Sequence, residues 1–356
     1  VGYNEEKTIA GAIRSLLDLD YPNMEIIVVD DGSTDAMYEK AKPFADQGLI
    51  QLYRNSAATG RGGRPAASSL ALKCSSGDYI LSVDADTSFD RGTILHMIGS
   101  FYDPSVGIVA GNLKVRNLHA GFWPRVQAIE YLLSITLWKS WLDLAGMNLQ
   151  ASGAFGAFRR KALLECGGWD PELGEDADLS LKVKKSGWKL VFARKAIAMT
   201  TVPSDLKTLI KQRYRWDRGT LRTYFHKHGD LFHIGRYGWR SAVELSIEYI
   251  FSVFLTFLYP IWFSYMLWFY PLVLIIVLGI AMGVYTVSTL IPFLGALSLS
   301  ERWREEWVLL FDIPGYLFYK GIFRWVRFYA MLLETLRVNY ETPYLPESAW
   351  RNSEKW

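Results

Sequence analysis

The sequence predicts an α/β domain that is followed by interfacial and transmembrane α-helices. Three observations lead to this prediction. Between Val1 and Gly111, short apolar runs alternate with helical stripes, a pattern typical of strands and helices packed in layers. Two of the apolar runs end in acidic residues, at Asp30 and Asp84. Much later, the 52 positions from Tyr249 to Ser300 contain no charged residue.

The elements of the α/β domain can be placed in order along the chain. The first helix shows an apolar stripe at Ile9, Ile13, Leu16 and Leu17, with the spacing of one helical face. The expected strands cover residues 25–29, 49–53, 79–83 and 106–111, and the expected helices cover residues 7–17, 34–45, 66–74 and 91–101. Because strands alternate with helices, we expect a largely parallel sheet.

The charge-free run predicts membrane helices. A bilayer core needs about 20 apolar residues per helix, so the run is long enough for two crossings, which we place at residues 245–269 and 271–298. The aromatic break at Trp268–Pro271 suits a turn at a membrane interface. Half of the residues are apolar and 15% are aromatic, which agrees with a membrane protein.

Basic residues gather ahead of the charge-free run and predict its orientation. They are Lys207, Lys211, Arg213, Arg215, Arg218, Arg222, Lys227, Arg236 and Arg240. By the positive-inside rule, they place the N-terminal domain in the cytoplasm. We therefore expect a multi-pass protein of the plasma or inner membrane, with membrane lipid as a partner. The net charge of +3 and the absence of a long Lys/Arg run exclude a nucleic-acid partner, and two cysteines imply no disulfide framework.

The remaining stretches complete the predicted organisation: an α/β domain over residues 1–203, an interfacial region over 204–240, a transmembrane region over 241–336 and a tail over 337–356. Residues 122–142 fit a helix on the membrane or along an acceptor groove, and equally a core helix. Residues 204–228 read as an amphipathic interfacial helix. In residues 313–336, Lys320, Arg324 and Arg327 form one charged stripe. That helix either lies at the interface or crosses as a third span.

Two acidic motifs follow the predicted strands. Asp30 and Asp31 precede a glycine, where their carboxylates can accept hydrogen bonds from a nucleobase N–H or from ribose hydroxyls, although an aspartate before Gly-Ser also caps turns. Asp84 and Asp86 lie two apart, so on an extended segment both would face one diphosphate and its cation. Carboxylate oxygens suit Mg²⁺ or Mn²⁺, but a single D-x-D is also common in surface turns.

Three later motifs carry further polar chemistry. Arg64 follows a glycine-rich stretch and can hold phosphate oxygens, and a solvated loop is the alternative. Glu175 and Asp176 stand before a helical stretch, where acidic residues also serve as N-caps. Gln212, Arg215 and Trp216 share one helical face, on which a tryptophan can stack on a sugar and an arginine can bind diphosphate.

In order and spacing, these motifs resemble the family 2 glycosyltransferases with a GT-A domain, in particular the membrane-bound synthases of cellulose, chitin, hyaluronan and poly-N-acetylglucosamine. The resemblance implies a Rossmann-like, nucleotide-binding mixed sheet, a UDP-sugar donor, and inverting transfer with Mg²⁺ or Mn²⁺ as cofactor. Asp176 would be the general base, beside Glu175, and Asp84 and Asp86 would bind the metal. The implied donor-binding residues are Tyr3, Glu5, Asp30, Asp31, Arg64, Asp84, Asp86, Gln212, Arg215 and Trp216. The implied acceptor-binding residues are Ser152, Gly153 and Trp216.

The resemblance leaves the acceptor open. The Gln-x-x-Arg-Trp motif beside membrane helices favours the non-reducing end of a growing polysaccharide, and the alternative is a lipid acceptor such as diacylglycerol, ceramide or polyprenyl phosphate. An inactive membrane scaffold is disfavoured because the acidic positions are present. Accessory or homo-oligomeric subunits fit either enzyme. Val1–Glu5 resembles the end of the family's first strand, so we expect the start of that strand and one or more transmembrane helices to precede it.

Overall fold

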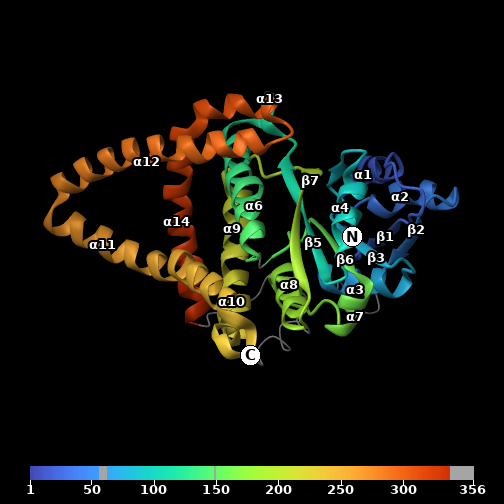
Figure 1. Ribbon diagram of the computed structural model, residues 1–356. Helices are drawn as coiled ribbons and strands as arrows, with labels where there is room; N and C mark the ends of the chain where they lie inside the picture. The colour runs from blue at the N-terminus through green and yellow to red at the C-terminus, as the bar shows by residue number, and fades with distance from the viewer. Residues whose placement is uncertain (56–61, 148–149, 337–356) are drawn as a thin grey trace. The chain divides into compact units, whose positions relative to one another are not determined.

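The computed structural model describes residues 1–55, 62–147 and 150–336, and the chain divides into two compact units (Figure 1). Unit 1 contains Val1–Lys114 and Asn148–Thr201, and unit 2 contains Val115–Met147 and Val202–Val338. The predicted tail, residues 337–356, and residues 60 and 61 of the glycine-rich stretch lie outside the described residues.

Unit 1 is built on two sheets. The strands are β1 (Ile27–Asp30), β2 (Gln51–Arg54), β3 (Tyr79–Val83), β4 (Ser88–Phe89), β5 (Val106–Val115), β6 (Phe155–Arg159) and β7 (Lys189–Thr200). The smaller sheet pairs β1 with β2 in parallel, and the larger has the order β3-β6-β5-β7-β4. The mixed α/β fold is therefore confirmed.

The prediction of a largely parallel sheet is wrong for the larger sheet. β6 lies between β3 and β5 and runs antiparallel to both, and β4 is antiparallel to β7. The strand–helix alternation correctly gave β3 and β5 the same direction. It did not reveal β6, which reaches the sheet from a tight turn after Ser152 rather than through a helical crossover.

The helices of unit 1 cover these sheets. They are α1 (Ile9–Leu17), α2 (Met37–Asp46), α3 (Gly63–Cys74), α4 (Thr93–Gly99), η1 (Ser100–Tyr102), α7 (Arg160–Glu165) and α8 (Glu175–Lys185). The predicted apolar stripe of α1 is confirmed for Ile9, Ile13 and Leu16, which pack in one apolar cluster with Val28 of β1 and Met37 of α2. Leu17, the fourth predicted position, is instead exposed. This cluster fixes β1, whose carboxyl end carries Asp30.

Unit 2 is helical. Its elements are η2 (Leu118–Ala120), α5 (Phe122–Tyr131), η3 (Leu132–Trp138), α6 (Lys139–Ala145), α9 (Leu206–Thr220), η4 (Leu221–Lys227), η5 (Gly229–Phe232), α10 (Ile234–Glu248), η6 (Tyr249–Phe254), α11 (Leu255–Phe269), α12 (Pro271–Leu299), α13 (Trp303–Glu306), η7 (Trp307–Asp312) and α14 (Ile313–Thr335). Asp205 caps α9 by accepting the Thr208 N–H at 2.9 Å. The predicted helices over 122–142 and 204–228 are present: the π-helical η3 joins α5 to α6, and the π-helical η4 follows α9.

Two helical segments of the described chain are long and apolar enough to cross a membrane. They are Ile234–Phe269, which joins α10, η6 and α11, and Pro271–Leu299, which is α12. Most of their side chains are exposed, as at Trp268 (82%) and Ile291 (77%). α14, with its charged stripe, is not among these segments.

Candidate active site

The extended segment at Val1 and Gly2 brings the ends of β1 and β3 together. The Gly2 N–H donates to the Val29 carbonyl at 3.1 Å, and the Ala85 N–H donates to the Val1 carbonyl at 3.2 Å. A Cβ on Gly2 would lie 2.7 Å from the Ala85 Cβ, so only glycine permits this approach. The acidic residues after the two strands therefore meet at one edge.

Asp30 and Asp31 take different places after β1. Asp30 is fully buried, accepts the Ser33 N–H at 2.8 Å and pairs with Arg54 Nε at 3.0 Å. It closes the Asp-Gly-Ser turn, as the turn-capping alternative predicts. Asp31 Oδ1 accepts the Asn55 amide at 2.7 Å and the Gly62 N–H at 3.1 Å, which ties the end of β2 to the start of α3.

Asp84 and Asp86 lie in a turn beyond β3, where the Thr87 N–H donates to the Asp84 carbonyl at 3.1 Å. The expectation that an extended segment points both carboxylates the same way is therefore wrong, because the strand ends at Val83. Asp86 Oδ1 accepts the Thr87 hydroxyl at 3.1 Å, whereas Asp84 faces Arg64.

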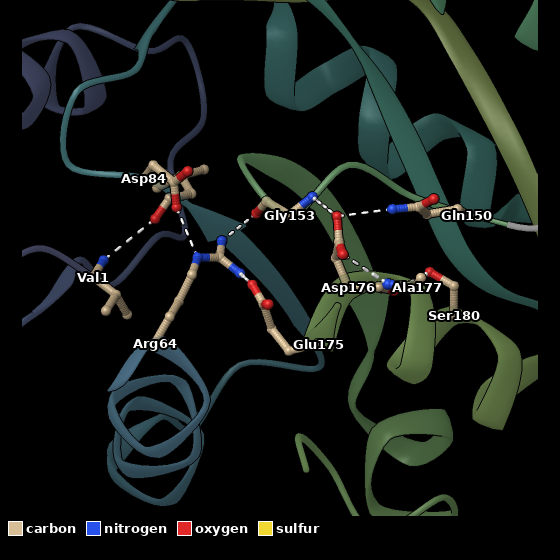
Figure 2. A network of polar contacts seen from close by, with 10 residues as sticks. Val1, Arg64, Asp84, Gln150, Gly153, Glu175, Asp176, Ala177 and Ser180 are labelled. Atoms are coloured by element: carbon tan, nitrogen blue, oxygen red, sulfur yellow. Dashed lines mark hydrogen bonds and ion pairs between the residues drawn. The ribbon is translucent and has the colours of Figure 1, made fainter. Parts of the chain in front are cut away.

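Arg64, in the first turn of α3, is the centre of the polar network in Figure 2. Its Nε donates to Asp84 Oδ1 at 2.8 Å, its Nη1 donates to Glu175 Oε1 at 3.0 Å, and its Nη2 donates to the Gly153 carbonyl. Burial would lower the pKa of Arg64, but Asp84 and Glu175 outweigh it and raise the pKa above its usual value. One charged guanidinium thus joins three segments that are distant in sequence.

Asp176 lies in the first turn of α8 and is held from two sides (Figure 2). Its Oδ2 accepts the Gln150 amide at 2.9 Å and the Gly153 N–H at 3.0 Å, and its Oδ1 accepts the Ala177 N–H at 2.8 Å. Ser180 adds support, because its hydroxyl donates to the Asp176 carbonyl at 2.7 Å and accepts the Ala151 N–H at 3.1 Å. These contacts fix the orientation of the carboxylate.

Gly153 connects the two halves of the network. Its carbonyl binds Arg64 and its N–H binds Asp176. A Cβ here would lie 3.2 Å from Arg64 Nη1 and 3.3 Å from Asp176 Oδ2, so any side chain would press on both. The neighbouring Ser152 forms the bridge to Phe155 that begins β6. The structure therefore places Gly153 in direct contact with the candidate base.

Glu5 and Tyr3 lie on the segment that follows Gly2. The Glu5 carboxylate accepts the Thr8 hydroxyl at 2.6 Å. Burial raises the pKa of Glu5 and nearby Asp84 raises it further, against the lowering effect of the Thr8 hydrogen bond. Glu5 is thus within electrostatic reach of Asp84, while Tyr3 is partly buried.

Gln212, Arg215 and Trp216 lie on α9, which belongs to unit 2. Trp216 is 37% exposed, and the Arg213 guanidinium lies 4.5 Å from the centre of its ring. The Gln212 side-chain oxygen is buried without a hydrogen-bond partner among the described residues. These three residues are therefore grouped on one helix, apart in the chain from the network around Arg64.

The residues near Asp84 fit a divalent cation that also binds substrate oxygens. No group of three or more His, Cys, Asp or Glu side chains suited to a metal occurs within residues 1–55, 62–147 and 150–336. Mg²⁺ and its relatives are commonly held by one or two carboxylates together with substrate phosphates and water. The Asp84 side chain is 37% exposed, so its carboxylate can supply one such ligand.

The sequence reasoning missed Gln150 and Ser180. Both support Asp176, and neither belongs to an acidic motif. A signal for Gln150 was its place just before the Ser152–Gly153 turn. The position of Ser180 four residues after Asp176 on a helix was a signal as well.

Residues 2–167 match the sequence profile of Glycosyl transferase family 2. Over 232 residues the chain is 34% identical to the poly-beta-1,6-N-acetyl-D-glucosamine synthase of Staphylococcus aureus strain COL, covering 63% of this chain and 55% of that protein. It is 33% identical over 222 residues to the synthase of Staphylococcus epidermidis, covering 61% and 52%. The chain thus spans about half the length of these relatives.

Among solved structures, the chain is similar to a mannosyltransferase of Pyrobaculum calidifontis in complex with GDP-Man and Mn²⁺. The TM-score is 0.66 and the sequence identity 19%, over 95% of this chain and 86% of that one. The similarity in fold therefore covers residues of both units. The matching profile identifies residues 2–167 as a Glycosyl transferase family 2 domain, and the solved structure agrees with a GT-A fold.

Proposed function

We propose that the protein is an inverting β-glycosyltransferase that moves a sugar from a UDP-sugar to the non-reducing end of a growing polysaccharide at the membrane. The observation that carries this proposal is the network in which Arg64 and Gly153 connect Asp84 with Asp176 (Figure 2). It joins a residue suited to the donor diphosphate to a residue suited to proton transfer.

Asp176 is the proposed general base. Inversion in one displacement forms a bond from the acceptor oxygen to the anomeric carbon and breaks the bond to UDP, while the acceptor hydroxyl proton passes to a carboxylate. Asp176 Oδ2 already accepts two hydrogen bonds, whereas Oδ1 accepts only the Ala177 N–H among the described residues. Because a carboxylate oxygen can accept about two hydrogen bonds, Oδ1 is the atom that takes the proton.

Arg64, Asp84 and Asp86 are proposed to hold the diphosphate side of the donor. A divalent cation bound by the two aspartates would offset the negative charge on the departing nucleoside diphosphate. Arg64 has charge-assisted hydrogen bonds to give to phosphate oxygens, and its contact with Glu175 keeps the guanidinium between the donor side and the base. Asp30 and Asp31 then shape the turn that borders the nucleoside.

The acceptor and the membrane location rest on other observations. The related synthases make poly-N-acetylglucosamine by name, and Ser152, Gly153, Gln212, Arg215 and Trp216 are the proposed contacts for the sugar chain and the donor. Two segments long and apolar enough to cross a membrane support a multi-pass enzyme. Basic residues before them support a cytoplasmic catalytic domain.

The test is a transfer assay on the membrane-reconstituted protein with a panel of radiolabelled UDP-sugars, beginning with UDP-N-acetylglucosamine. The proposal expects a polymer that is degraded by an enzyme specific for the transferred sugar. A product with a single sugar on a lipid would overturn polymer synthesis in favour of the lipid-acceptor alternative. Absence of transfer from every UDP-sugar, with UDP binding intact, would overturn the donor assignment.

A further inference from the structure

The charged stripe of α14 divides into two parts in the structure. Arg327 donates to Asp217 Oδ1 of α9 at 2.8 Å and is thereby neutralised. Lys320 and Arg324 instead line a cavity of about 1150 Å³ in unit 2. The cavity is partly open and is lined by residues of α5, η3, α11, α12 and α14. In Figure 1, α11, α12 and α14 form a triangle.

Lys320 and Arg324 give the cavity a positive end. Within the described part of the chain, neither forms an ion pair, and each cation lies over an aromatic ring: Lys320 Nζ is 5.6 Å from the centre of the Tyr316 ring and Arg324 is 4.5 Å from that of Tyr259. The carboxylate among the lining residues, Glu130, is bound by Arg213 at 2.5 Å and by the Tyr319 hydroxyl at 2.8 Å. Two cations therefore line the cavity without forming an ion pair among the described residues.

The rest of the wall is largely apolar, and its tryptophan and tyrosine rings are the groups there that could stack on a sugar. Aliphatic and aromatic side chains of η3, α11 and α12 make up most of it. The hydroxyls of Ser134 and Ser288 donate to carbonyls of their own helices, those of Glu130 and Tyr285. A polysaccharide would lose many hydrogen bonds to water in such a space, whereas an apolar chain would not.

The position of the cavity indicates where its occupant comes from. α11 and α12 carry large exposed apolar side chains on their outer faces, such as Ile261 (68%) and Leu272 (75%). If they cross the membrane, the cavity lies beside acyl chains. Its volume exceeds the roughly 300–1,000 Å³ of ordinary small-molecule pockets, which suits a ligand with long chains.

We infer that this cavity binds an anionic phospholipid of the bilayer, with its phosphate on Lys320 and Arg324 and its acyl chains along α11 and α12. Arginine and lysine both form charge-assisted hydrogen bonds to phosphate. The lipid completes the packing of α14 against α11 and α12. This inference is independent of the sugar that the enzyme transfers.

The test measures lipid binding to the detergent-solubilised chain by native mass spectrometry. Phosphatidylglycerol is titrated against phosphatidylcholine, and glycerol phosphate serves as a competitor without acyl chains. We expect preferential binding of phosphatidylglycerol that glycerol phosphate does not displace. In Lys320→Gln/Arg324→Gln we expect phosphatidylglycerol to bind at least about tenfold more weakly, as the loss of charged hydrogen bonds predicts.

The control is Arg236→Gln/Arg304→Gln, which removes two exposed cations outside the cavity and should bind phosphatidylglycerol normally. A cavity-filling variant, Ala281→Trp, should also lose the lipid while it keeps the charge of the wild type. Equal binding of the two lipids, unchanged binding in both cavity variants, or displacement of lipid by a soluble oligosaccharide of the product would each overturn the inference.

Discussion

The two units each contain a cluster of arginines and carboxylates, but the clusters differ in their exposure to solvent. In unit 1, Arg64 lies among Asp84, Glu175 and Asp176, so negative charge is in excess, and the Asp84 side chain is 37% exposed. In unit 2, Glu334 is fully buried between Arg218 and Arg222, at 2.9 Å from each Nε, so these ion pairs are sealed from water.

This difference in exposure suggests that the first cluster binds substrate, whereas the second cluster stabilises the fold. An open acidic cluster with one arginine can exchange partners with a cation or a diphosphate, because water and substrate reach it. A sealed cluster has no such freedom, and its charges act to hold α9 and η4 against α14. Changes in the first cluster should therefore alter transfer, and changes in the second should alter stability.

The strongest way to break the comparison is Asp176→Asn. Because the amide cannot accept the acceptor proton, transfer should fall by about 10²–10⁴-fold, with UDP binding and the thermal unfolding midpoint close to wild type. Transfer is measured by sugar incorporation and UDP binding by calorimetry. An Asp176→Asn enzyme that transfers sugar at the wild-type rate would remove Asp176 from the mechanism.

In the sealed cluster, Glu334→Ala should lower the free energy of unfolding by about 3–5 kcal/mol, since it removes a buried carboxylate that pairs with two buried arginines. The measurement is the thermal or denaturant unfolding of the detergent-solubilised protein. Glu305→Ala is the matched control, because Glu305 forms an exposed pair with Arg302, and such pairs contribute about 0–1 kcal/mol. Equal stability of the two variants would contradict a structural role for Glu334.

A further prediction tests whether the exposed cluster of unit 1 binds a divalent cation together with UDP. UDP should bind more tightly with Mg²⁺ or Mn²⁺ than in excess EDTA, and Asp86→Ala should reduce that difference, because one of two proposed carboxylate ligands is lost. Calorimetry of UDP binding reads this directly, and EDTA should also stop transfer. Full transfer in excess EDTA argues that the aspartates bind the donor without a cation.

A variant of Gln150 tests whether its hydrogen bond to Asp176 contributes to the rate of transfer. Gln150→Leu removes the amide that donates to Asp176 Oδ2, and a hydrogen bond to a charged group is worth about 1.5–3 kcal/mol. We expect kcat to fall by about tenfold or more while the KM for the donor stays unchanged. Gln47→Leu, at an exposed glutamine after α2, is the control. A change in donor KM alone would place Gln150 in donor binding instead.

The smallest effect is expected for Trp216, whose exposed ring distinguishes it from the sealed arginines of the same unit. If the ring stacks on the acceptor, Trp216→Ala loses about 0.5–1.5 kcal/mol of aromatic interaction beyond area burial, or roughly two- to tenfold in elongation. Trp216→Phe should recover part of it. Product length on a gel is the measurement, and polymer of normal length from Trp216→Ala would assign this ring to surface anchoring.

Much of the fold could be predicted because its elements are local. The strand at Tyr79–Val83 has the predicted bounds, and β1, β2 and α3 lie within a few residues of theirs. β6 and β7 were missed for physical reasons. Phe155–Arg159 is short and adjoins a functional turn, and β7 carries Lys189, Arg194 and Lys195, which interrupt the apolar pattern of a strand.

Most residues of the candidate site could be predicted from the sequence, but the contacts between them could not. Acidic residues at strand ends mark a ligand edge by type and place alone. The contacts of Arg64 with Gly153 and Glu175 span 89 and 111 residues, and spacing in the sequence holds no information on such pairs. The turn at Asp84 likewise depends on where β3 stops pairing with β6.

The lengths of the two long apolar segments have a consequence for the bilayer itself. Of the 36 residues in Ile234–Phe269, 15 belong to α10 with its charged residues, which leaves 21 for the apolar part, or about 31 Å. α12 has 29 residues, about 43 Å, and follows after Tyr270 alone. A hydrocarbon core of about 30 Å matches the first segment and is too thin for the second. In a crossing pair, α12 would tilt strongly or thicken the surrounding lipid, so the protein should favour membranes with long acyl chains.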